Sequence, residues 1–131
     1  MRWFVIQEHH ARSHHFDLRL ERDGVLVSWA IPKGMPTDSK KNRLATRAEA
    51  HALSHLDFEN GAPVESVPGE GVPGAMRVRI WDRGTYEAEE FGGEMIIVTL
   101  QGESLHDRYA IFRAEKSWLV HLMDPAEEKR S

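Results

Sequence analysis

Two histidines, an aspartate and an arginine near the N-terminus could together form a metal site that binds a phosphate. They are His9, His15, Asp17 and Arg19. Two imidazoles and one carboxylate can hold a divalent cation and leave coordination positions open for a substrate. The planar guanidinium of an arginine can bind two oxygens of one phosphate. Because a His-x-Asp pair on a hairpin is most often simply solvated, the interpretation depends on the elements that position these residues.

The segment that begins at His15 is predicted to form a β-hairpin. Residues 15–21 alternate polar and apolar side chains, which is typical of a strand with one buried face. Asp23-Gly24 separates them from residues 25–31, a run rich in β-branched and aromatic side chains. Asp-Gly between two such runs favours a tight type I′ turn. The sequence therefore predicts two antiparallel strands joined by a two-residue loop.

This turn fixes the register, and the register separates a polar face from an apolar face. Arg19 is expected opposite Ser28 and Asp17 opposite Ala30, and cross-strand partners share a face of the sheet. The small partners leave space above the charged side chains, as in a site built on a rigid sheet. The other face carries the predicted core residues Phe16, Leu18, Leu20, Val27, Trp29 and Ile31.

An upstream strand is expected to bring His9 into the site. Gln7 and His9 alternate with their neighbours, and a turn at residues 10–14 can fold this strand back beside His15. His9, His15 and Asp17 would then converge on one point. The chain has 8 histidines, and five of them are at or near the proposed site, namely His9, His10, His14, His15 and His51.

Composition places the chain among ordinary soluble domains. Its 131 residues, 40% hydrophobic and 29% charged, suffice for one domain with its own core. No apolar run reaches the roughly 20 residues of a membrane span, and the N-terminus lacks signal-peptide features, so we expect a cytoplasmic protein. The absence of cysteine excludes disulfides and thiolate metal sites. The net charge of −4 argues against a general nucleic-acid coat but not against a local grip on one phosphate.

The middle of the chain is less clearly patterned. Residues 43–50 fit a strand better than a helix, with the odd-numbered positions from Arg43 to His51 on one face. His51 and His55 are four apart, a spacing that suits a metal site on a helix but more often marks ordinary surface histidines. Residues 59–74 are rich in proline and glycine and are expected to form a loop.

The C-terminal half is predicted to consist of antiparallel strands. They are residues 75–81, a polar edge-like strand 85–91, and then 94–100, 108–113 and 117–121, with a turn at 82–84. Many short strands without a helical pattern indicate a small sandwich or barrel. We therefore predict an all-β domain over residues 1–123 and a charged, frayed tail over residues 124–131.

The order of these residues resembles a known family. The run Q-x-H-x5-H-x-D-x-R-L-E-x-D-G-V-L-x-S-W-A-x-P-K-G begins at Gln7 and is similar to the 3′-phosphoesterase module of bacterial DNA ligase D and its free-standing bacterial and archaeal relatives. The similarity continues through Arg43-Leu44-Ala45, Glu49-x-His51, Asp57-Phe58-Glu59 and Trp81-Asp82-Arg83-Gly84-Thr85, and more loosely to Trp118-Leu119. The resemblance implies a single-domain, mostly antiparallel β-barrel with a polar crater and few or short helices.

The resemblance also implies roles for individual residues. His9, His15 and Asp17 would be catalytic and would ligate manganese or another divalent transition metal. Arg19 and His51 would hold the scissile phosphate, and the supporting substrate-binding positions would be Gln7, Lys33, Arg43 and Glu49. His55 stands where the family usually has a tyrosine, and the aromatic residue of the family's glycine-rich loop is missing between Gly69 and Met76.

The implied function is metal-dependent healing of DNA 3′ ends in non-homologous end joining. The enzyme would hydrolyse a 3′-phosphate and remove a 3′-terminal ribonucleoside from DNA or RNA-tipped primer ends, acting as a monomer beside a separately encoded ligase or polymerase. Because six residues precede Gln7, where family members with resection activity have a longer arm, phosphate hydrolysis is the more strongly expected activity. Two alternatives stay open: a non-catalytic end-binding barrel, and an iron(II) oxygenase, whose facial triad also has two histidines and one carboxylate.

Overall fold

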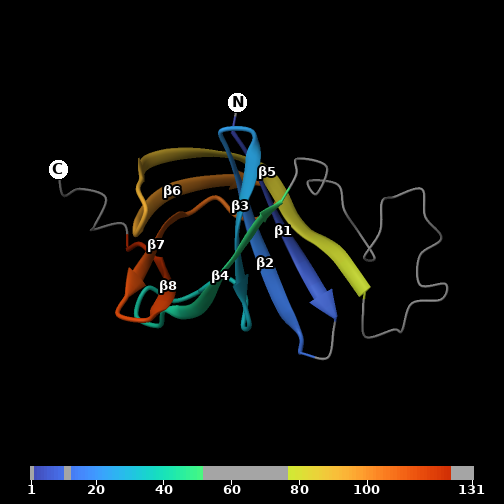
Figure 1. Ribbon diagram of the computed structural model, residues 1–131, viewed down its shortest axis with the longest axis horizontal. Coiled ribbons are helices and arrows are strands. Elements are labelled where there is room, and N and C mark those ends of the chain that lie inside the picture. The colour runs from blue at the N-terminus through green and yellow to red at the C-terminus, as the bar shows by residue number, and fades with distance from the viewer. Residues whose placement is uncertain (1, 11–12, 52–76, 125–131) are drawn as a thin grey trace.

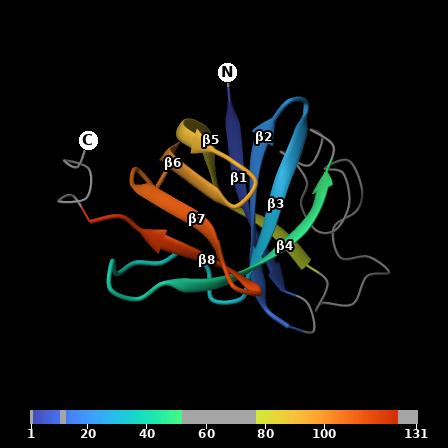
Figure 2. The same ribbon diagram turned by 60° about the vertical axis from the view of Figure 1, so that its left-hand side comes forward.

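Eight antiparallel strands wrap around a common axis and close into a barrel in the computed structural model (Figures 1 and 2). The structure describes residues 2–10, 13–51 and 77–124. The strands are β1 (Trp3–His10), β2 (His15–Arg22), β3 (Val25–Ile31), β4 (Arg43–His51), β5 (Arg77–Phe91), β6 (Met95–Gly102), β7 (Arg108–Ala114) and β8 (Ser117–Leu122). Their order around the barrel is β1-β2-β3-β4-β8-β7-β6-β5, and β5 pairs with β1 to close it. The predicted all-β antiparallel barrel is confirmed, and the sandwich alternative is wrong.

The hydrophobic core fills the interior of the barrel. Every strand contributes to one cluster of buried side chains, whose largest members include Phe4, Trp29, Tyr109, Leu100 and Ile111. Side chains that alternate with these on each strand therefore lie on the outer face of the barrel wall. The part of the chain that the structure describes contains no helix long and apolar enough to cross a membrane.

The predicted hairpin is confirmed, register included. Asp17 pairs with Ala30 and Arg19 with Ser28, and the pairing runs without a shift from the open end of the hairpin to the turn. Both turn residues have positive φ, 52° at Asp23 and 86° at Gly24. This is the backbone that a type I′ turn requires, and the Asp-Gly pair adopts it with little strain. β1 folds back as expected, so that His9 pairs with His15.

The turn predicted at residues 82–84 is wrong, because β5 runs through it without a break. Gly84 permits a close approach of β6 rather than a turn, since a Cβ at this position would collide with the carbonyl oxygen of Gln101. Residues 85–91 are not an edge either. They pair with β6, and Tyr86 is buried in the core.

The strand predicted around residues 43–50 is confirmed, but its odd-numbered positions do not share one face. Arg47 pairs with Trp29, and its guanidinium lies 5.0 Å from the centre of a Trp29 ring. A register shift in the β3–β4 pairing then places His51 opposite Leu26. Because Leu26 and Trp29 point to opposite faces of β3, the shift breaks the alternation. The predicted loop at 59–74, the start of the strand predicted at 75–81 and the tail beyond residue 124 lie outside the described residues.

Candidate active site

The outer face of the β1–β2 hairpin brings together two histidines and an aspartate. The Nε2 of His9 lies 2.6 Å from Oδ2 of Asp17, and the Nε2 of His15 lies 3.7 Å from Oδ1 of the same carboxylate. One ligand atom from each residue lies within 4.8 Å of the others. The two imidazoles stack, with ring centroids 4.7 Å apart and an interplanar angle of 17°. The donor atoms that the sequence predicted as a cation site therefore converge.

A backbone hydrogen bond orients the His15 ring. Its Nδ1 lies 2.9 Å from the carbonyl oxygen of Ser13. A carbonyl oxygen can only accept, so Nδ1 donates this hydrogen bond and Nε2 is the ring nitrogen that faces Asp17. Metal-binding histidines are commonly oriented by such a bond on the nitrogen that does not ligate.

Arg19 lies beside the trio as a buried cation held by three acceptors. Its Nε donates to Oε1 of Gln7 at 2.7 Å, one Nη to Oγ of Ser28 at 2.9 Å, and the other Nη to Oδ2 of Asp17 at 3.3 Å. Only 5% of Arg19 is exposed, and Gln7 and Ser28 are fully buried. These bonds hold the guanidinium plane in one orientation, while each Nη carries a second N–H.

Asp17 and Arg19 both remain charged in the site. Burial alone would raise the pKa of Asp17, but the hydrogen bond with His9 and the interactions with His9, Arg19 and His15 outweigh it and lower the pKa. Burial lowers the pKa of Arg19, and the Asp17 carboxylate partly offsets this effect. Arginine starts from so high a pKa that the guanidinium remains protonated at neutral pH. The site therefore presents an ionised carboxylate next to a fixed cation.

The remaining predicted residues are less closely tied to the trio. Lys33 is exposed in the loop after β3, and its carbonyl oxygen accepts a hydrogen bond from Arg43 at 3.3 Å. Glu49 is exposed on β4. His51 is the last residue of β4, and its backbone pairs with Leu26. His55 lies outside the described residues.

Ser28 has a part in the site that sequence reasoning missed. It was expected only as a small neighbour that leaves space beside Arg19, but its hydroxyl accepts from Arg19 and donates to the carbonyl oxygen of Leu26 at 3.0 Å. The available signal was the predicted register, which already paired Ser28 with Arg19. A buried hydroxyl opposite a buried arginine is expected to hydrogen-bond to it.

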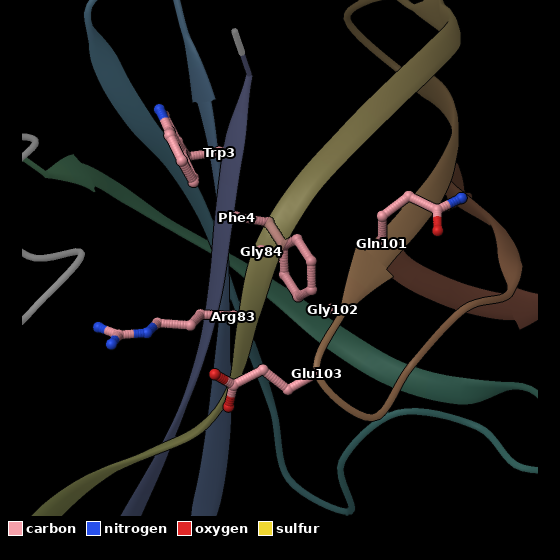
Figure 3. A pocket seen from close by; sticks show the side chains of 7 residues that line it. All are labelled: Trp3, Phe4, Arg83, Gly84, Gln101, Gly102 and Glu103. Carbon is pink, nitrogen blue, oxygen red and sulfur yellow. The ribbon is translucent and has the colours of Figure 1, made fainter.

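A separate cavity of about 540 Å³ lies near the first residues of β1 (Figure 3). It is lined by Trp3, Phe4, Arg83, Gly84, Gln101, Gly102 and Glu103. Trp3 and His9 lie on one strand, and at about 3.3 Å per residue they are roughly 20 Å apart. The cavity contains none of the predicted site residues and is therefore distinct from the charged cluster.

Comparison with known proteins identifies the family of the chain. The family model described as the DNA Ligase D 3′-phosphoesterase domain matches residues 7–113. Among curated proteins, the multifunctional non-homologous end joining protein LigD of Mycolicibacterium smegmatis is 46% identical over 140 residues, covering 97% of this chain and 18% of that protein. LigD of Mycobacterium bovis is 44% identical over 132 residues, covering 97% and 17%. LigD of Pseudomonas aeruginosa is 38% identical over 117 residues, covering 84% and 13%.

The chain thus spans less than a fifth of the length of these relatives. The family match nevertheless covers most of the chain and includes the trio and Arg19, which lie on β1 and β2. This protein belongs to the DNA ligase D 3′-phosphoesterase domain family.

Proposed function

We propose that this protein hydrolyses phosphate monoesters at the 3′ ends of DNA, with His9, His15 and Asp17 as ligands of a divalent cation. The observation that carries the proposal is the convergence of these three donors beside a fixed arginine. Family membership favours phosphoester hydrolysis over the iron(II) oxygenase chemistry that the same donor set can support.

The donor set fits a divalent transition metal. Two imidazole nitrogens and one carboxylate oxygen occupy three positions of a coordination sphere and leave the others for water and substrate. When bound, manganese or a related cation would polarise the phosphate and lower the pKa of a ligated water. The ligating atoms would be Nε2 of His15, whose Nδ1 is engaged by the carbonyl oxygen of Ser13, and Nε2 of His9.

The protein's own contribution is charge stabilisation and orientation. The second N–H of each Nη of Arg19 can donate to phosphate oxygens and stabilise the charge that spreads over them during transfer. Gln7 and Ser28 fix the guanidinium before substrate arrives. The Ser28 hydroxyl is buried and engaged on both sides, which favours direct attack by water over a serine nucleophile. His51 is proposed as the donor to the leaving O3′ or to the phosphate.

The reaction converts a 3′-phosphate and water into a 3′-hydroxyl and inorganic phosphate. A 3′-hydroxyl is the end that a ligase or polymerase requires, which suits the role of the LigD relatives in non-homologous end joining. The proposal has further parts. The protein would also remove a 3′-terminal ribonucleoside, act as a monomer in the cytoplasm, and work beside a separate ligase or polymerase. The residues with supporting roles would be Lys33, Arg43, Glu49 and His55.

The test uses a 5′-labelled DNA primer–template that carries a 3′-phosphate, beside a version tipped with one ribonucleotide. Each is incubated with purified protein and manganese, or with manganese and excess chelator. We expect manganese-dependent conversion of the 3′-phosphate to a 3′-hydroxyl, resolved as a mobility shift on a denaturing gel. Loss of the ribonucleoside from the second substrate would extend the activity to resection.

One result of this assay would contradict the proposal. If neither end changes while the protein binds both manganese and the DNA end, the cluster recognises ends without turning them over. The non-catalytic end-binding barrel then replaces the phosphoesterase.

A further inference from the structure

A second group of metal-ligand side chains lies on the opposite face of the β1–β2 hairpin. Glu8 and His10 alternate with His9 along β1, so their side chains point away from the site described above. His14 precedes β2 and shares this second face with Phe16. Glu8, His10 and His14 each offer a ligand atom, and the three atoms lie within 4.8 Å of one another.

Both imidazoles direct Nε2 at the same carboxylate oxygen. The Nε2 of His14 lies 2.8 Å from Oε2 of Glu8, and the Nε2 of His10 lies 3.4 Å from it. The two rings stack at a centroid distance of 4.6 Å and an interplanar angle of 10°. Three donors that converge from a strand and from the end of the turn that follows it are the arrangement of a small tridentate site.

Neighbouring side chains hold the donors in place. Arg79 donates to Oε1 of Glu8 at 3.0 Å, which leaves Oε2 directed at the imidazoles. The Phe16 ring packs against His14 at 5.3 Å and against Trp81 at 5.8 Å. A carboxylate that is oriented by an outer partner and an imidazole that packs on an aromatic ring are features of supported metal ligands.

The carboxylate of this second group is largely buried, whereas its two imidazoles are exposed to solvent. The Glu8 side chain is 11% exposed, whereas those of His10 and His14 are both 49% exposed. The carboxylate is therefore anchored in the barrel wall, and the imidazoles remain reachable from solvent. An ion could enter without rearrangement of the core.

We propose that Glu8, His10 and His14 form a second binding site for a divalent transition-metal ion of the zinc type, with a structural role. Two imidazoles and a carboxylate are a common zinc ligand set. The ion would bridge His10 and His14, the two ends of the turn between β1 and β2. Because His9 and His15 are the adjacent residues, this clip would fix the spacing of the two histidines proposed to be catalytic.

Binding exchanges protons for the ion. Without metal, the histidines can donate Nε2–H to Glu8, and on ligation each imidazole releases that proton to solvent. No oxidation or group transfer is involved. The site is separate from the proposed function, although its structural effect would reach the histidines of that function.

The test is metal stoichiometry of the full chain. Protein stripped with chelator is dialysed to equilibrium against buffered zinc, and bound zinc per chain is measured by mass spectrometry. We expect two ions for the wild type, and one after His10→Ala or His14→Ala. The matched control is His106→Ala, which removes another exposed histidine and should leave two ions bound.

A second variant separates this proposal from the proposed function. Asp17→Ala disables the first cluster, and this protein should still bind one ion and show a higher melting temperature in zinc. The combined change Asp17→Ala and His14→Ala should remove both the ion and the shift. If His14→Ala binds as much zinc as the wild type, the second site does not exist, whatever the 3′-phosphate assay gives. If Asp17→Ala alone keeps two ions while His14→Ala loses one, the second site stands and the ligand assignment of the proposed function fails.

Discussion

At the scale of single residues, the geometry of the candidate site depends on a buried arginine. A guanidinium taken out of water is stable only when its N–H groups have acceptors, and Arg19 finds them in Gln7, Ser28 and Asp17. The planar fork of arginine serves these three acceptors and keeps two further N–H groups, whereas a lysine ammonium has only three N–H groups in all. Gln7 is therefore a positioning residue, because it acts on the site through Arg19.

Replacing Gln7 with leucine tests this positioning role. Gln7→Leu removes the acceptor at 2.7 Å and leaves the Nε–H of Arg19 buried without that partner. Loss of such a bond is expected to lower the free energy of unfolding by about 1–3 kcal/mol, measured by urea titration. We also expect kcat for 3′-phosphate release to fall roughly tenfold with little change in KM, because a misaligned guanidinium stabilises the transition state less.

Gln101→Leu is the matched control, since Gln101 is exposed on β6. It should change the free energy of unfolding by no more than about 0.5 kcal/mol and leave kcat unaltered. A Gln7→Leu protein with lowered stability but wild-type kcat would show that Gln7 only supports the fold.

At the scale of elements, Asp82 connects β5 to the loop between β6 and β7. Its side chain is almost fully buried, and its carboxylate accepts four backbone N–H groups. The donors are Arg83 at 2.9 Å, Glu103 at 2.8 Å, Ser104 at 3.2 Å and Leu105 at 2.9 Å. The Asp82 carboxylate thus satisfies the backbone N–H groups of three consecutive loop residues, Glu103 to Leu105.

Asp82→Ala should be among the most destabilising single changes in the chain. It leaves four partly buried backbone N–H groups without their acceptor, and bonds to a charged group contribute more than neutral ones. We expect the free energy of unfolding to fall by about 3 kcal/mol or more. Asp107→Ala, at an exposed position in the same loop, should change it by no more than about 0.5 kcal/mol. Equal effects of the two variants in urea unfolding would contradict the bridging role of Asp82.

The sequence predicted those elements that local chemistry determines. The Asp23-Gly24 turn and strict alternation specify the β2–β3 register completely, and the structure matches it. Asp82 and Gly84 were assigned to a turn because these residue types favour turns. Their actual roles depend on partners about twenty positions away, the loop donors and the carbonyl of Gln101, and no local pattern reveals these. The β-bulge that realigns His51 is likewise set by pairing across the sheet.

The candidate site follows the same division. The convergence of His9, His15 and Asp17 could be predicted because all three lie on one hairpin-like unit with a short turn. In the second cluster, the contact of Arg79 with Glu8 could not be predicted, since the two residues are far apart in sequence and meet only when β5 closes the barrel. The residues predicted beyond β3 depend on such long-range pairing and were assigned through family resemblance alone.

At the scale of the whole molecule, the closed barrel buries a polar group that makes stability depend on pH. Tyr109 lies in the core and is only 1% exposed. Burial, with smaller effects from the nearby carboxylates of Asp107 and Asp82, raises the pKa of its phenol well above the usual value. The folded protein therefore keeps this proton at a pH where the unfolded chain releases it.

Alkaline unfolding should reveal this difference. The contribution of Tyr109 is fully present below the unfolded pKa of about 10 and is lost as pH rises toward the higher folded pKa. Above about pH 10, wild-type stability should fall relative to Tyr109→Phe by up to about 1.4 kcal/mol per pH unit, measured by urea unfolding at several pH values. A constant difference between the two proteins across this range would contradict the assigned pKa shift.

The proposed metal centre is tested most directly by the turnover of its ligand variants. The rate of 3′-phosphate release from a DNA primer–template is measured at saturating manganese for His9→Ala, His15→Ala and Asp17→Ala, with His106→Ala as the control. Circular dichroism and urea unfolding verify that each variant is folded. The account predicts that all three ligand variants fall to the uncatalysed background while the control keeps the wild-type rate. A folded ligand variant that retains the wild-type rate would contradict the proposed metal centre.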